Sequence, residues 1–64
     1  MKRYDEGISA ATHCTELAPE YADGYLLLGL LQKEKGLKDE AIKNLKKAQE
    51  LGDTRAADYL SKMK

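Results

Sequence analysis

The fold is decided by residues 22–51, which read ADGYLLLGLLQKEKGLKDEAIKNLKKAQEL. Gly36 divides this stretch into two segments, each long enough for nearly four helical turns. Glycine after a basic last turn is the residue expected at the left-handed position that ends a helix. Asp39 and Glu40 then fall in a first turn, where the helix dipole favours negative charge. The stretch therefore predicts two antiparallel helices joined by a tight turn.

The chain outside this stretch predicts one further helix on each side. A helix before Pro19 must end near residue 18, because proline disfavours the helical conformation in the residue before it. Gly52 ends the helix after Gly36, and Asp53 or Thr54 caps a short final helix. Alternation typical of strands is absent, and β-branched residues are few. Helices are expected at residues 3–17, 21–35, 38–51 and 54–63.

The chain also repeats itself with a period of 34 residues. When residues 1–30 are placed over residues 35–64, eight of the 30 pairs are identical, among them Tyr25/Tyr59 and Leu26/Leu60. Chance would give roughly two identities, and a fixed period of this length is typical of helical repeat proteins. The period is therefore real.

Together the period and the motif identify a family. The motif consists of Tyr25-x-x-Leu28-Gly29, Gly36, Asp39-Glu40-Ala41-Ile42, Leu45, Ala48 and Leu51. In this spacing the chain resembles the tetratricopeptide repeat. The resemblance implies an all-α fold of antiparallel helix-turn-helix repeats, stacked as a short right-handed α-solenoid of about four helices. It makes residues 22–55 a complete repeat, residues 1–21 the second helix of a preceding repeat, and residues 56–64 a closing helix. The chain is then a single domain or the C-terminal part of a longer array.

Small residues mark where the helices should come closest. The resemblance places Gly29 and Ala41 at the crossing of the paired helices, and Ala48 where the second helix meets the next repeat. A larger side chain at any of these positions would push the backbones apart. Gln32 departs from the family pattern, which prefers an aromatic residue at its position.

Composition excludes several functional classes. Eleven Lys and Arg residues balance eleven Asp and Glu residues, whereas nucleic-acid and anionic-membrane binders carry a basic excess. The longest apolar run, Leu26–Leu31, is far shorter than the ~20 residues of a membrane span. The N-terminal residues lack the apolar region of a signal peptide, which favours a cytoplasmic protein.

Catalytic chemistry has no residues to carry it. His13 and Cys14 are adjacent, so they point about 100° apart on a helix, and no other His or Cys exists to complete a metal site. No glycine-rich phosphate loop, nucleophile elbow or histidine base is present. We therefore expect no enzyme activity, no metal or other cofactor, and no small-molecule substrate.

The surface predicted to bind a partner lies on the helix that begins the complete repeat. In the family, such helices line a concave groove, and this implies six groove residues here: Asp23, Leu26, Leu27, Leu30, Lys33 and Glu34. Leu26 and Leu30 are expected to face solvent, which favours an apolar contact with a partner. Lys33 is the one basic residue in the set, which argues against the clamp that grips a terminal carboxylate in some family members. The leading prediction is therefore a module that binds a peptide or helix of another protein.

The alternative is a structural unit that associates with itself. The helix of residues 3–17 is read as the second helix of a pair whose first helix is missing. Its apolar stripe of Tyr4, Ile8 and Ala11 then has no partner within the chain. Leaving such side chains in water forfeits roughly 1.5–3 kcal/mol for each large one, which favours a homodimer.

Overall fold

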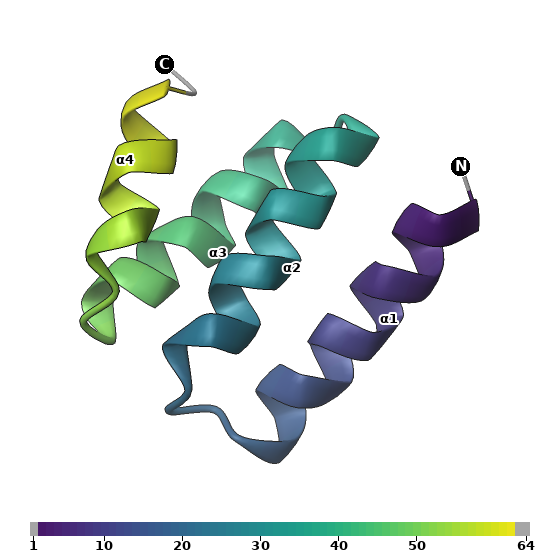
Figure 1. The fold of residues 1–64 in the computed structure, drawn as a ribbon, viewed down its shortest axis with the longest axis horizontal. Helices are drawn as coiled ribbons and strands as arrows, with labels where there is room; N and C mark the ends of the chain where they lie inside the picture. Colours follow the sequence, from purple (N-terminus) through teal and green to yellow (C-terminus); the bar gives the residue numbers. More distant parts are fainter. Residues whose placement is uncertain (1, 63–64) are drawn as a thin grey trace.

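The computed structural model describes residues 2–62, which form four α-helices arranged side by side in chain order (Figure 1). Each helix packs against the next one along the chain, and the contact between α2 and α3 is the most extensive. This confirms the all-α, helix-turn-helix architecture. The helices are α1 (Lys2–Leu17), α2 (Ala22–Lys35), α3 (Lys38–Glu50) and α4 (Thr54–Lys62).

Each helix boundary lies within one residue of its predicted position, apart from the predicted end at residue 63. Residues 63 and 64 of the predicted closing helix fall outside the described residues. Gly36 and Gly52, which follow α2 and α3, have positive φ angles of 96° and 104°. In both turns the residue after the glycine donates its N–H five residues back, from Leu37 to the Gln32 carbonyl and from Asp53 to the Ala48 carbonyl. Two helix ends are therefore closed by the same glycine-dependent turn.

The crossing of α2 and α3 is centred on Gly29. A Cβ atom at this position would lie 2.8 Å from Leu45 Cγ and 3.1 Å from the Ala41 carbonyl oxygen, so no larger residue fits without displacing α3. Leu45 and Ala41 are both fully buried. The predicted close crossing is confirmed, and the absence of a side chain at Gly29 lets the two backbones approach.

The core continues from this crossing toward α4. Leu45 and Ala48 of α3 share one buried cluster with Ala56 of α4 and Leu26 of α2. Both Ala48 and Ala56 have no exposed area, so α3 and α4 meet through small side chains. This confirms the predicted role of Ala48 toward the next helix. The structure also overturns the expectation that Leu26 faces solvent, because Leu26 is 6% exposed and belongs to the cluster formed with α3 and α4.

Gln32 takes the place of the aromatic residue that the family prefers, and it is almost fully buried. Its Oε1 accepts a hydrogen bond of 2.7 Å from Nδ2 of Asn44 on α3. The same Asn44 nitrogen donates to the Glu40 carbonyl at 3.0 Å. Because the Gln32 carbonyl group is satisfied, burial of this side chain costs little, and the pair fixes the register of α2 against α3.

Helix α1 packs on α2 through two glycines. A Cβ on Gly7 would meet Leu31 Cδ1 at 2.9 Å, and one on Gly24 would meet Cys14 Sγ at 3.3 Å. One glycine on each helix thus brings the two axes close together. Asp5 at the start of α1 also forms an ion pair with Lys35 at the end of α2.

The prediction of an unpartnered stripe on α1 is wrong for Ala11, which is only 1% exposed, and Tyr4 and Ile8 are half-buried. The physical reason is angular. Ala11 lies about 40° around the helix from Gly7, and Gly7 faces α2. The large apolar side chain that α1 does leave in solvent is Leu17, at its C-terminal end.

Among the described residues, no helix combines the length and apolar character that crossing a membrane requires.

The small-residue contacts predict a strong contrast between two charge substitutions on α3. Ala48→Glu should lower the free energy of unfolding by several kcal/mol, because it places a carboxylate where no exposed area exists. Lys46→Glu introduces the same side chain at an exposed position and should change the free energy of unfolding by less than about 0.5 kcal/mol. Urea unfolding followed by circular dichroism measures both, and equal losses would contradict the packing described here.

Candidate partner-binding site

A small open hollow lies against α2 at the end where α4 begins. Its volume is about 260 Å³. Four of its lining residues come from α2 and one from the first turn of α4. They are Asp23, Leu26, Leu27, Leu30 and Arg55.

The apolar part of the hollow follows from helix geometry. At about 100° per residue, the α2 lining residues span one arc that runs from Leu26 through Leu30 to Leu27. Leu26 lies at the core edge of this arc and is buried, Leu30 is half-buried, and Leu27 is 51% exposed at the solvent edge. The arc therefore presents a graded apolar wall that the protein's own helices leave partly uncovered.

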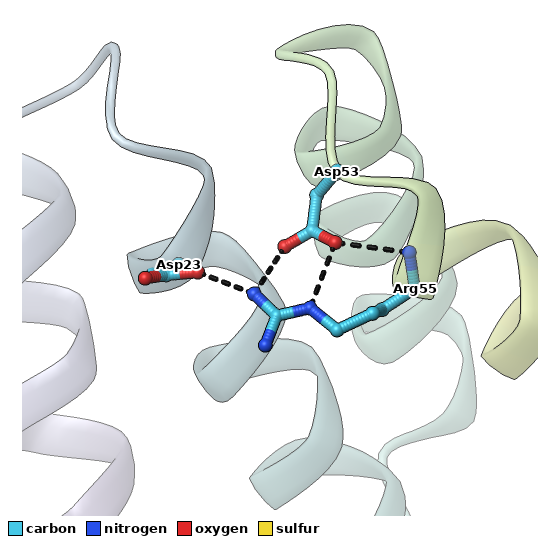
Figure 2. Close-up of polar contacts among 3 residues, drawn as sticks. All are labelled: Asp23, Asp53 and Arg55. Carbon is cyan, nitrogen blue, oxygen red and sulfur yellow. Dashed lines mark hydrogen bonds and ion pairs between the residues drawn. The ribbon is translucent and has the colours of Figure 1, made fainter.

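The polar rim is an ion-pair network that joins the first turns of α2 and α4 (Figure 2). Arg55 Nη2 donates to Asp23 Oδ1 at 2.6 Å and to Asp53 Oδ2 at 2.8 Å. Arg55 Nε and the Arg55 backbone N–H both donate to Asp53 Oδ1, at 3.0 and 2.9 Å. Asp53 therefore caps α4, as predicted, and at the same time orients the Arg55 side chain toward Asp23.

Charge in this network is strongly paired. The hydrogen bonds from Arg55 lower the pKa of Asp53 below its ordinary value of 3.8. In turn, the hydrogen bond and the charge of Asp53, followed by those of Asp23, raise the pKa of Arg55 above its ordinary value. Both groups are charged throughout the physiological range, so the network persists there.

The structure brings together four of the six residues predicted for the groove. Lys33 and Glu34 are exposed near the far end of α2, and neither lines the hollow. Leu27, which was predicted to line the groove, is half-exposed in the hollow, whereas Leu26 was expected in solvent and is buried. The two adjacent leucines therefore differ in exposure, and the expectation is wrong for Leu26.

Arg55 is the site residue that sequence reasoning missed. The repeat gives no signal for it, since the equivalent position in the earlier copy holds Tyr21. The available signal was Asp53, because a capping aspartate two residues before an arginine places the two side chains together.

A broader depression along α1 is a weaker candidate. All its lining residues come from that single helix, so nothing closes over it, and within residues 2–62 no three metal-ligating side chains gather there or elsewhere. The residues that line this depression are Glu6, Ser9, Ala10, Thr12, His13 and Glu16.

Comparison with known proteins gives one finding. Residues 22–52 match the family described as tetratricopeptide repeat. No curated protein and no solved structure matches the chain. The matched segment contains α2, the α2–α3 crossing and four of the five residues of the hollow.

The lowered pKa of Asp53 predicts a specific loss of stability in acid. A carboxylate whose pKa is lower in the folded state stabilises the fold above its unfolded pKa, and this contribution disappears as the pH falls through the folded pKa. The free energy of unfolding should therefore fall as the pH drops below about 4. Asp53→Asn keeps an acceptor for the helix cap but cannot titrate. Its free energy of unfolding should therefore fall less steeply in acid than that of the wild type. Urea unfolding between pH 2 and 6 measures this, and identical profiles would contradict the assignment.

Proposed function

The chain belongs to the tetratricopeptide repeat family through residues 22–52, and we propose that it is a non-catalytic protein-binding module whose hollow receives a segment of a partner. Repeats of this family mediate contacts between proteins, and that general role applies here. The finer proposal concerns where contact occurs. We assign it to the hollow lined by Asp23, Leu26, Leu27, Leu30 and Arg55.

The observation that carries the proposal is the exposure of Leu27 beside the other leucines of the hollow. Leu27 is 51% exposed, although it lies within α2 and the residues before and after it, Leu26 and Leu28, are buried. Covering this side chain would add to the apolar burial that Leu26 and Leu30 already have. A bound partner would bury the exposed Leu27 side chain in this way.

The size of the hollow favours a protein segment over a small molecule. Pockets that bind drug-sized ligands enclose roughly 300–1,000 Å³ and bury most of the ligand. This hollow is smaller, at about 260 Å³, and open. It suits an apolar side chain projecting from a helix or an extended segment of another protein.

A free terminal carboxylate is a poor fit. Arg55 is the one cation in the lining, and its guanidinium already bonds two carboxylates of the chain. An incoming carboxylate would have to displace Asp23 and would meet Asp53 beside it. An apolar anchor needs no such exchange.

Self-association through Tyr4, Ile8 and Ala11 is less well supported than partner binding. Ala11 is buried against the chain's own α2 side, and the other two side chains are half-buried. The stripe therefore offers little apolar area beyond what α2 already covers. We expect sedimentation equilibrium to find a monomer over a wide concentration range, and a stable dimer broken by Ile8→Glu would restore the alternative.

The proposal is tested with a displayed library of segments about 16 residues long, which span about 24 Å as helices. Each segment carries two fixed leucines and random flanks, and selected peptides are then synthesised and titrated against the ¹⁵N-labelled chain. Backbone amide shifts should concentrate on residues 23–30. Replacing Leu27 by Gln should weaken binding about tenfold, because exposed apolar area at a contact is lost.

Leu17→Gln is the matched control, since it removes an even more exposed leucine that lies outside the hollow. It should leave affinity unchanged. Shifts confined to α1, or equal weakening by the two substitutions, would contradict the assignment of the hollow.

A further inference from the structure

The rim of the hollow carries an imbalance of charge. Asp23 and Asp53 contribute two negative charges, and Arg55 contributes one positive charge, so the network as a whole has a net charge of −1 (−2 + 1). Lys33, the nearest basic residue along α2, lies ten residues from Asp23, which corresponds to about 15 Å along the helix. That is about twice the screening length of ~8 Å at physiological salt, so Lys33 does not neutralise the rim.

The two carboxylates are not equivalent. The Asp53 side chain is 7% exposed, and both of its oxygens already accept hydrogen bonds from Arg55. The Asp23 side chain is 59% exposed, and only its Oδ1 faces the guanidinium. Figure 2 shows the second Asp23 oxygen directed away from Arg55. Asp23 is therefore the carboxylate of the network that a partner can contact.

Asp23 and the apolar wall are close enough for one partner segment to contact both. Asp23 precedes Leu27 by four residues, or about 6 Å along α2, and the two residues line the same hollow. When a side chain of a helical partner contacts Leu27, the next turn of the partner helix lies close to the Asp23 carboxylate.

We propose that the hollow selects apolar segments that carry a lysine or arginine about one helical turn from the apolar anchor. The Asp23 carboxylate recognises this cation by forming an ion pair with it. The inference rests on the proposed function and deepens it by naming the chemistry of the partner. A partner cation completes the charge of the rim, with two cations against two carboxylates. A partner carboxylate would instead add a third negative charge.

The experiment uses the library described above, selected in parallel on the wild type and on three variants. Asp23→Asn removes the charge, and Asp23→Glu preserves it. Asp39→Asn is the matched control, because it also removes an exposed acid from the first turn of a helix but lies outside the hollow. Thermal melts followed by circular dichroism establish that each variant is folded, as expected for a change at an exposed ion pair.

Lysine and arginine should be enriched over aspartate and glutamate at one flanking position on the wild type, Asp23→Glu and Asp39→Asn, but not on Asp23→Asn. A selected peptide resynthesised with glutamine in place of that cation should bind the wild type about two- to fivefold more weakly. The same replacement should have no effect on binding to Asp23→Asn.

Each other result overturns the inference in a distinguishable way. One such result is enrichment of apolar segments without a basic preference, or with a basic preference that persists on Asp23→Asn. In either case the proposed function stands, but Asp23 is not the residue that recognises the partner cation. Enrichment of acidic residues would show that Arg55 exchanges Asp23 for a partner carboxylate. Failure to select any apolar segment would overturn the proposed function and this inference together.

Discussion

Close contact between α2 and α3 at Gly29 is the constraint on which the rest of the structure depends. Leu45 occupies the space that a side chain at Gly29 would take, and its burial is complete. Because α2 is held to α3 along this side, its opposite arc is turned outward, and Leu27 lies there. The hollow is thus a consequence of which side of α2 is used for the crossing. A residue larger than glycine would rotate or displace α2 and change the arc that it presents.

Small residues solve the same packing problem at the other two interfaces. Ala48 and Ala56 let α4 approach α3, while Gly7 and Gly24 let α1 approach α2. These residues contribute little apolar area of their own. Their effect is to bring helices close enough for the larger neighbours to make many dispersion contacts. A domain of this size therefore gains its cohesion from close approach of its helices rather than from a bulky core.

Most of the fold could be predicted from the sequence because its signals are local. Gly36 and Gly52 end helices by adopting positive φ angles, and a conformational requirement of that kind is visible in the residue itself. The same logic found the Gly29 crossing and the Asp53 cap. Such features depend on one residue and its near neighbours in the chain.

The errors have a common cause, which is that several faces of one helix are apolar. On α1, the stripe that includes Ala11 could face either a preceding helix or α2, and only the position of Gly7 against Leu31 decides between them. On α2, Leu26 and Leu27 are adjacent and chemically identical, so their opposite exposures follow from where α3 and α4 lie. Sequence periodicity identifies apolar residues but does not say which neighbour covers each of them.

Arg55 links these errors to the chemistry of the site. It comes from α4, and it reaches Asp23 because α4 is seated on α3 through Ala56 and oriented by Asp53. The cluster that joins Leu26 to Ala56 therefore also seats the helix that brings a cation to the rim of the hollow. Since that cation is already shared between two carboxylates, it orders the rim without giving it a positive surface. The selectivity that we propose for the hollow thus depends on the Asp23 oxygen that the network leaves facing outward, an arrangement that arises only when α2, α3 and α4 are assembled.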